Sequence, residues 1–501
     1  MKKKLFFCFL FPFLGFSQSQ IGQSIYGAVM NSVNGSSLAI SDDGQIIAMG
    51  APGMQNPSGI VTGSISVFEK SGNEWIPFGQ TLFGNSENNY IGSRKSLAMS
   101  SNGNVIAFGV PSYSDFFEFA GQVKVMQFVN NSWVQLGNDI NGNENEKFFG
   151  SNVSISENGY ILAISGVLSI GFDSTGFVRV YEYASGVWSQ LGSDLLGLNV
   201  NDNFGADIDI SSSGDVLVVG APFGLSLNEE ETGNVRVFTY ISGEWFQLGE
   251  VLYGEMPNDR FGDSVSISAN GEIIAVGSPY SNENGIESGS VKVYQFDSNE
   301  WLQISDNILG EDVYNHFGTS ISLSSDGNVL AVGAPHNDVH GNYNGSTWLN
   351  FGSVRIYKNV LGLWNQVGND IDGINMQDYC GDAVVISGNG NSVIISSTGN
   401  NFDGTIWYAG QVRVFDLNYL LSTQDYVFDK IDVYPNPTSG IVHLNIQNDV
   451  NMNSIYIYDQ IGKFVLQTNQ KSIDLSKLSS GVYYLKIHTD RGTGIKKIIL
   501  K

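Results

Sequence analysis

Cysteine is almost absent from this sequence. Only Cys8 and Cys380 occur among 501 residues, and Cys8 belongs to the apolar N-terminal segment described next. With one cysteine left in the remainder, no disulfide can form within the chain. Cys380 precedes a glycine where sister repeats have phenylalanine, so we expect a small buried apolar residue and not a reactive thiol.

Long hydrophobic runs are also missing. The longest, 5–16, follows Lys2-Lys3-Lys4 and ends before the polar residues 17–20. A membrane-spanning helix needs roughly 20 apolar residues, so we expect no transmembrane segment. A basic start, a short apolar core and a polar exit are typical of a secretory signal peptide, which we predict over residues 1–18. Bulky Phe6 and Phe7 before Cys8 argue against the alternative, a lipoprotein signal.

Positive charge is scarce, with 24 Lys and Arg against 49 Asp and Glu and a net charge of −25. Nucleic-acid binding requires a basic surface that neutralises phosphates, so nucleic acid is not an expected partner. The self-repulsion of an acidic chain favours a soluble monomer. Nucleophile elbow, zinc-protease helix and phosphate loop are all missing from the sequence. We therefore expect no catalytic residues, no cofactor and no enzymatic activity.

Glycine and aromatic residues are abundant, with 60 Gly, 30 Phe and 22 Tyr, which favours short strands and tight turns. The stretch 317–335 shows the recurring unit. Ile321 and Leu323 alternate with serines, a turn follows at 325–327, and 329–334 returns as an apolar strand. The same hairpin occurs seven times, with turn glycines at Gly44, Gly103, Gly159, Gly214, Gly271, Gly327 and Gly390.

Each hairpin is followed by a second pair of strands, and the fourth strand begins near a tryptophan in six repeats. Four strands in about 56 residues correspond to one blade of a β-propeller. The third strands carry a recurring cation, which we interpret as structural because it repeats around the ring. The tryptophans are Trp75, Trp133, Trp188, Trp245, Trp301 and Trp364, and the cations are Lys124, Arg179, Arg236, Lys292, Arg355 and Arg413.

The seventh repeat stops after its third strand, at 412–415. Its missing fourth strand is at the other end of the chain, because 21–27 matches the end of every fourth strand. Closure by the N-terminus removes the free edges of an open stack. We predict an all-β fold, with a seven-bladed propeller over 21–418 closed by the N-terminal strand.

The combination of Phe-Gly before the hairpin and Gly-Ala-Pro after it resembles the FG-GAP repeat of integrin α-subunits and bacterial surface proteins. It is present as Phe204-Gly205 with Gly220-Ala221-Pro222 and as Phe317-Gly318 with Gly333-Ala334-Pro335. The calcium-binding members have a longer acidic loop in the first hairpin. The turns here are too short to supply six to eight oxygen ligands, so we expect the integrin-like calcium sites to be absent.

Long and variable loops connect the second and third strands of the blades, whereas the opposite face has short, uniform turns. Variable loops on a rigid scaffold often carry function. Aromatic side chains on these loops suit stacking on sugars or docking on a protein; the alternative is that they fold back over the blades. The candidate ligand-binding residues are Phe116, Phe117, Phe119, Tyr343, Trp348, Trp407 and Tyr408.

Histidines gather in the sixth repeat. His336 and His340 flank Asp338 in one loop, and His316 precedes the hairpin on the same face. Imidazole and carboxylate groups are transition-metal ligands, so these four residues are a weak metal candidate. Solvated loop residues are the simpler interpretation, and we predict no metal site.

A linker, 419–427, separates the repeats from a second domain at 428–501, whose short strands suggest a small Ig-like β-sandwich. Its motifs 433–440 and 475–483 and its end 496–501 resemble the type A sorting domain of type IX secretion in Bacteroidetes. The resemblance implies recognition by the outer-membrane translocon and a cell-surface or extracellular location. The matching positions are Tyr434, Pro435, Asn436, Pro437, Gly440, Gly481, Tyr483, Lys496 and Lys497.

These observations predict a secreted or cell-surface, non-enzymatic propeller that binds an extracellular polysaccharide or protein. One alternative is a carbohydrate-active enzyme with carboxylates at the centre of the propeller. The other is a structural protein of the envelope or matrix. Convergent carboxylates in a pocket would favour the enzyme, and an aromatic surface on the long loops would favour binding.

Overall fold

The computed structural model describes residues 18–114, 117–170, 173–338, 349–360, 362–418, 431–446, 451–460, 463–489 and 492–501. The predicted linker and all of the predicted signal peptide except Gln18 lie outside these ranges. All forty-three elements assigned in the described residues are β-strands, which confirms the all-β prediction. None of the described residues form a helix long and apolar enough to cross a membrane.

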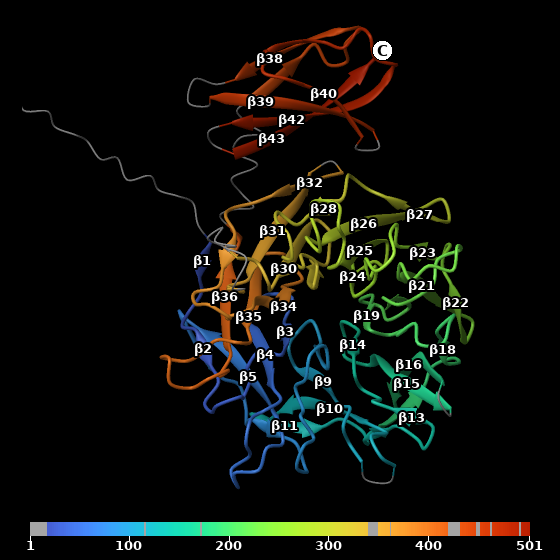
Figure 1. The fold of residues 1–501 in the computed structure, drawn as a ribbon, viewed down its shortest axis with the longest axis vertical. Helices are drawn as coiled ribbons and strands as arrows, with labels where there is room; N and C mark the ends of the chain where they lie inside the picture. Colours follow the sequence, from blue (N-terminus) through green and yellow to red (C-terminus); the bar gives the residue numbers. More distant parts are fainter. Residues whose placement is uncertain are drawn as a thin grey trace, which may run out of the picture.

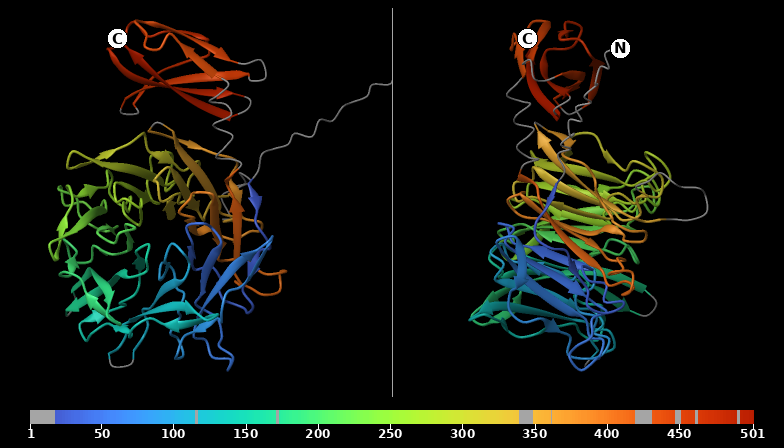
Figure 2. Two further views of the ribbon diagram at one scale, coloured as in Figure 1. Left: turned by 180° about the vertical axis from the view of Figure 1, so that it is seen from behind. Right: turned by 90° about the vertical axis from the view of Figure 1, so that its left-hand side faces the viewer.

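Seven sheets form a ring, one for each repeat, and two further sheets form a separate body (Figure 1). Within each sheet of the ring, four antiparallel strands are arranged from the centre outwards, and a short further strand pairs with the third strand beside the outer one. The sheet of the third repeat has one more short strand, so it contains six strands and the other sheets contain five. Figure 2 shows the ring from behind and from its edge. We number the sheets as blades 1 to 7 in chain order.

Each blade is one uninterrupted chain segment, apart from blade 7. Blade 1 contains β3 (Ser37–Ile40), β4 (Ile46–Ala51), β5 (Ser64–Ser71), β6 (Glu74–Pro77) and β7 (Leu82–Phe83). Blade 2 contains β8 (Leu97–Met99), β9 (Val105–Val110), β10 (Gln122–Val129), β11 (Ser132–Gln135) and β12 (Ile140–Asn141). Blade 3 contains β13 (Glu146–Lys147), β14 (Val153–Ile155), β15 (Ile161–Ile170), β16 (Asp173–Ala184), β17 (Val187–Gln190) and β18 (Leu195–Leu196).

The remaining blades repeat the same order. Blade 4 contains β19 (Asp207–Ile210), β20 (Val216–Ala221), β21 (Asn234–Ile241), β22 (Glu244–Gln247) and β23 (Leu252–Tyr253). Blade 5 contains β24 (Ser264–Ile267), β25 (Ile273–Ser278), β26 (Ser290–Asp297), β27 (Glu300–Gln303) and β28 (Ile308–Leu309). Blade 6 contains β29 (Ser320–Leu323), β30 (Val329–Ala334), β31 (Ser353–Val360), β32 (Leu363–Gln366) and β33 (Ile371–Asp372).

Blade 7 joins the two ends of the repeat region. Its inner strands are β34 (Cys380–Ile386), β35 (Ser392–Ser397) and β36 (Gln411–Asp416), and its outer strands are β1 (Ser19–Gln20) and β2 (Ile25–Tyr26). Ser19 pairs with Asp416 and Ile25 with Val412, both antiparallel. The N-terminal segment therefore lies where the repeat pattern places it.

Hydrogen bonds join the short turns on one face into a second closed ring, which we call the turn belt. In every blade, a backbone N–H in the turn between the first two strands donates to a carbonyl in the corresponding turn of a neighbouring blade. Such bonds satisfy groups that would otherwise face only solvent. The donor–acceptor pairs are Asp42–Ser101, Ser101–Glu157, Glu157–Ser212, Ser212–Ala269, Ala269–Ser325, Ser325–Gly388 and Asn389–Asp42, at 2.9–3.0 Å.

The paired glycines of the repeat lie where adjacent blades approach through their backbones. A Cβ atom on Gly220 of blade 4 would be 2.0 Å from the carbonyl oxygen of Gly262 in blade 5. Gly109 and Gly333 meet the next blade in the same way. Only glycine permits this approach, which gives the Phe-Gly and Gly-Ala-Pro pattern a packing reason.

Tryptophan side chains connect the outer parts of neighbouring blades. The indole of Trp245 donates to the carbonyl of Leu191 in the preceding blade at 2.9 Å, and the indole of Trp75 donates to Ile21 at 3.0 Å. Trp133, Trp188 and Trp301 make the corresponding bond. Trp364 is buried with its indole nitrogen unpaired among the described residues.

The recurring cations of the third strands are engaged within the blades. They contact carboxylates or phenylalanine rings, including those of the Phe-Gly pairs. This arrangement supports the structural interpretation and identifies phenylalanine as the aromatic partner in these contacts. The contacts are Lys124–Asp139, Arg179–Asp194, Lys292–Glu255, Arg355–Asp370, Arg236–Phe204 and Arg413–Phe415.

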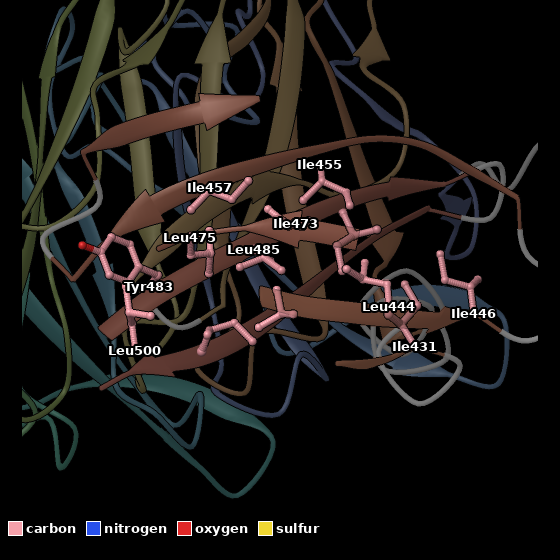
Figure 3. Packing of buried hydrophobic residues seen from close by; sticks show 13 residues of the cluster. Ile431, Leu444, Ile446, Ile455, Ile457, Ile473, Leu475, Tyr483, Leu485 and Leu500 are labelled. Carbon is pink, nitrogen blue, oxygen red and sulfur yellow. The ribbon is translucent and has the colours of Figure 1, made fainter. Parts of the chain in front are cut away.

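The C-terminal body is a β-sandwich. One sheet contains β37 (Ile431–Tyr434), β38 (Ile441–Ile446) and β41 (Ser472–Asp474), and the other contains β39 (Met452–Asp459), β40 (Phe464–Thr468), β42 (Gly481–Thr489) and β43 (Gly492–Leu500). Ile431 and Leu444 of the first sheet share one core with Ile457 and Leu485 of the second (Figure 3). The short strand β41 was missing from the sequence-based prediction.

Candidate functional site

Exposed aromatic side chains mark the face with the long loops, which we call the long-loop face. Phe117 and Phe119, in the blade 2 loop, are each 42% exposed, and Trp407 and Tyr408, in the blade 7 loop, are 55% and 41% exposed. The two groups belong to different blades, with blade 1 between them. Phe116, Tyr343 and Trp348 lie outside the described residues.

A second set of side chains on this face occupies the position before each Phe-Gly pair or its equivalent. All seven residues have left-handed backbone angles, with φ between 48° and 55°. Because such angles are uncommon for residues other than glycine, the repeat imposes the same turn on each blade. The residues are Val33, Tyr90, Phe148, Asn203, Arg260, His316 and Tyr379.

Two members of this set enlarge the aromatic surface near blade 2. Tyr90 is 39% exposed and Phe148 is 45% exposed. The ring centroids of Phe148 and Phe119 are 5.9 Å apart, so the loop and the turn form one aromatic group. Sequence reasoning missed Tyr90 and Phe148, although their place before the glycine pairs was visible in the repeat.

Between blades 4 and 7, three members of the set, Arg260, His316 and Tyr379, belong to a row of contacting side chains that also includes Tyr280 and His336. Arg260 lies 3.9 Å from the ring centroid of Tyr280. Tyr280 and His336 each have a ring centroid 4.6 Å from that of His316, and His336 reaches Tyr379 at 5.5 Å. Tyr280, His316, His336 and Tyr379 thus pack against one another, two of the contacts edge to face, whereas Tyr90, Phe117, Phe119, Phe148, Trp407 and Tyr408 are more exposed.

The structure brings His316 and His336 together but gives each a protein partner. His316 Nε2 lies 3.0 Å from Glu287 Oε2, and His336 Nδ1 lies 3.1 Å from Asn350 Oδ1. Burial, with a contribution from His316, lowers the pKa of His336. Asp338 Oδ1 accepts hydrogen bonds from the backbone N–H groups of Leu349 and Asn350. His340 lies outside the described residues, among which no three metal-ligating side chains are grouped.

The innermost strands of all seven blades line a central cavity of about 260 Å³. Side-chain oxygens in this cavity accept hydrogen bonds from the next blade. Asp209 accepts from Ile267 N at 2.9 Å, and Ser266 Oγ accepts from Leu323 N at 3.1 Å. Burial raises the pKa of Asp209 to about 6. The cavity therefore contains three carboxylates. Asp207 and Asp209 accept hydrogen bonds from the next blade, whereas Asp382 accepts a bond from the Thr398 hydroxyl of its own blade.

Blade 2 differs from the others at the opening of this cavity. In six repeats, the serine that follows the first strand lies six positions after the glycine of the Phe-Gly position. In blade 2, Ser100 lies eight positions after Gly92. The two additional residues, Arg94 and Lys95, line both the central cavity and an adjoining one. A comparison of the seven repeats would have revealed them, but sequence reasoning did not single them out.

The sorting-domain residues converge at the C-terminal strand. The Asn436 side chain donates to the Lys497 carbonyl at 2.6 Å and accepts from Ile499 N at 2.9 Å. Gly481 pairs with Leu500, and Tyr483 pairs with Ile498.

Tyr434, Pro435 and Pro437 frame the turn that carries Asn436, in which both X–Pro bonds are cis. Gly440 follows this turn, and its N–H donates to the Thr438 hydroxyl at 3.1 Å. Lys496 and Lys497 lie on β43.

Comparison with known families agrees with both parts of this description. Residues 432–501 match the secretion system C-terminal sorting domain, and residues 254–294, which include Phe261-Gly262, match the FG-GAP repeat. Integrin alpha-2 of Bos taurus is 29% identical over 214 residues. This match covers 40% of the chain and 16% of the bovine protein.

Solved structures with a similar arrangement have low identity to the chain. Hydrazine synthase of Kuenenia stuttgartiensis has a TM-score of 0.48 at 13% identity, covering 79% of this chain and 98% of that one. A periplasmic gluconolactonase of Pseudomonas aeruginosa has a TM-score of 0.43 at 13% identity, covering 68% and 85%. The repeats and the C-terminal motifs identify the chain as an FG-GAP-repeat β-propeller protein with a type IX sorting domain, exported to the cell surface or the extracellular space.

Proposed function

We propose that the exported propeller binds an extracellular polysaccharide or protein through its long-loop face and catalyses no reaction. The observation that carries this proposal is the asymmetry of the two faces. The turn belt engages the short turns of one face in bonds between blades. The other face exposes aromatic side chains on loops and turns that differ from blade to blade. Exposed aromatic groups are typical contacts for sugar rings and for protein partners.

Two of the three carboxylates that line the central cavity support a non-enzymatic role. Asp207 and Asp209 accept backbone N–H bonds from Val265 and Ile267 of blade 5 at 2.9 Å. A glycosidase requires a pair of carboxyl groups that face the scissile bond, whereas these two face the next blade. The enzyme alternative predicts that a bound glycan is cleaved. Analysis of the solution above the array for released product detects this cleavage.

The test uses the purified propeller on a glycan array and on the surface of intact cells. We expect Trp407→Ala and the double variant Phe117→Ala/Phe119→Ala to lose at least about tenfold in affinity, since truncation of an aromatic residue at the centre of an interface typically costs about 2 kcal/mol or more. Phe246→Ala is the matched control, because Phe246 is 54% exposed on the outer strand β22, away from the long loops. Unchanged binding in both aromatic variants would contradict the proposal.

A further inference from the structure

The two additional residues of blade 2 have different surroundings. Lys95 crosses from blade 2 to blades 4 and 5. Its ammonium group lies 3.2 Å from Asp207 Oδ2 and donates to the carbonyls of Asp263 at 2.5 Å and Ala206 at 3.5 Å. An ammonium has three donors, so these contacts use all of them. Lys95 is therefore a positioning residue that fixes the turn carrying Arg94.

Arg94 keeps most of its hydrogen-bonding capacity. The side chain is exposed, and its contact among the described residues is one bond to the Thr319 carbonyl of blade 6, at 3.2 Å. A guanidinium has five N–H donors in a planar fork. Several donors thus remain available at the opening of the central cavity.

The space beside Arg94 is a polar cavity of about 320 Å³. Ser151, Asn152, Asn203 and Asp263 are among the residues that line it. The turns that carry Ser93 and Ser151 also carry the exposed rings of Tyr90 and Phe148. The hydroxyls of Ser93 and Ser151 donate to the carbonyls of Tyr90 and Phe148, respectively. A cationic fork, polar groups and adjacent aromatic rings therefore occupy one sector of the long-loop face.

We propose that this cavity binds the carboxylate of an acidic sugar, a uronic acid residue, with Arg94 as the contact. The proposal rests on the proposed binding function and names its ligand class. A guanidinium fork matches a carboxylate in two parallel hydrogen bonds. Serine and asparagine side chains pair with sugar hydroxyls, and an exposed aromatic ring can stack on the sugar face.

The charge of the chain strengthens the case for Arg94. With a net charge of −25, the protein repels anions over distances up to the Debye length, about 8 Å at physiological salt. A carboxylate can then bind only where a local cation compensates. The polar lining favours a ligand rich in hydroxyl groups over an acidic peptide.

The experiment is isothermal titration of the mature full chain with trimers of galacturonic, glucuronic and mannuronic acid. Galactotriose is the neutral probe, and a peptide of three aspartates is the non-sugar probe. We expect at least one uronate to bind and galactotriose to bind at least about tenfold more weakly, as expected from loss of a charged hydrogen-bond pair. Arg94→Gln should weaken uronate binding to the same extent, and Arg94→Lys should give an intermediate affinity because it keeps the charge without the fork.

Lys70→Gln, which removes one cation from β5 away from the cavity, is the matched control and should bind as the wild type does. Failure of all three uronates to bind, or full binding by Arg94→Gln, would overturn the inference. Equal, Arg94-dependent binding of the aspartate peptide would overturn the sugar assignment. If uronates fail while cell binding still depends on Trp407 and Phe119, this inference falls and the proposed function stands.

Discussion

The Asp209 side chain has two opposing roles in blade 4. Its carboxylate accepts hydrogen bonds from Ile267 N, from Ile210 N and from the Ser154 hydroxyl, and so links three blades. The same position removes the group from water, and this burial raises its pKa to about 6. Removal from water disfavours the charged form of an acid. Protonation of Asp209 therefore makes the stability of the contacts at the centre of the ring depend on pH.

This residue predicts a pH dependence of stability. The native pKa lies above the ordinary value of 3.8, so between pH 4 and pH 6 the native state binds more protons than the unfolded chain. The free energy of unfolding then decreases as the pH rises through this window. We expect Asp209→Asn, which does not titrate, to gain about 1–3 kcal/mol relative to the wild type between pH 4 and pH 7.

Urea unfolding of the purified propeller at several pH values measures this difference. Asp215→Asn is the control for the loss of one carboxylate, because Asp215 is an exposed turn residue of the same blade. A constant difference between Asp209→Asn and the wild type across the pH range would contradict the prediction.

At the scale of elements, one glutamine connects the closing N-terminal segment to blade 1. Gln23 Nε2 donates to the Trp75 carbonyl at 2.8 Å, and Gln23 Oε1 accepts from Trp75 N at 3.0 Å. Gln80 makes the same pair of bonds with Trp133 between blades 1 and 2. The N-terminal segment therefore uses the same connection as an internal blade, although it closes the ring.

We expect Gln23→Ala to lower the free energy of unfolding by about 1 kcal/mol, since it removes two partly exposed hydrogen bonds. Gln20→Ala is the control, because among the described residues the Gln20 side chain bonds to Gly22 and Ser24 of its own segment. Chemical denaturation of both variants checks the prediction. Equal effects of the two substitutions would show that the connection to Trp75 does not stabilise the closure.

The elements most easily predicted were those whose signal is local and repeated. The hairpin at 317–335 combines period-two alternation with a turn glycine, so its strands β29 and β30 follow from the sequence. The direction of Arg94 and Lys95 across the cavity depends on contacts with blades 4, 5 and 6, which no local pattern contains. The strand β41, three residues long, is too short for a periodic signal.

At the scale of the whole molecule, export is assigned to the C-terminal sandwich, and the proposed binding function belongs to the ring. The ring has closed edges and an exposed aromatic face, whereas the sandwich carries the sorting residues at its C-terminal strand. We expect recognition by the secretion machinery to depend on a defined position of this strand. Asn436 fixes this position, because its side chain bonds to the backbone of β43 on both sides of Ile498.

We therefore expect Asn436→Ala to lower the free energy of unfolding of the sandwich by about 1–2 kcal/mol through the loss of two hydrogen bonds, and to reduce the exported fraction. Asn445→Ala is the matched control, because Asn445 is exposed on β38 and should leave both quantities unchanged. Immunoblots of medium, cell-surface and cell fractions measure export, and thermal unfolding measures stability. If Asn436→Ala destabilised the sandwich but export stayed at the wild-type level, the position of the C-terminal strand would not be what the secretion machinery recognises.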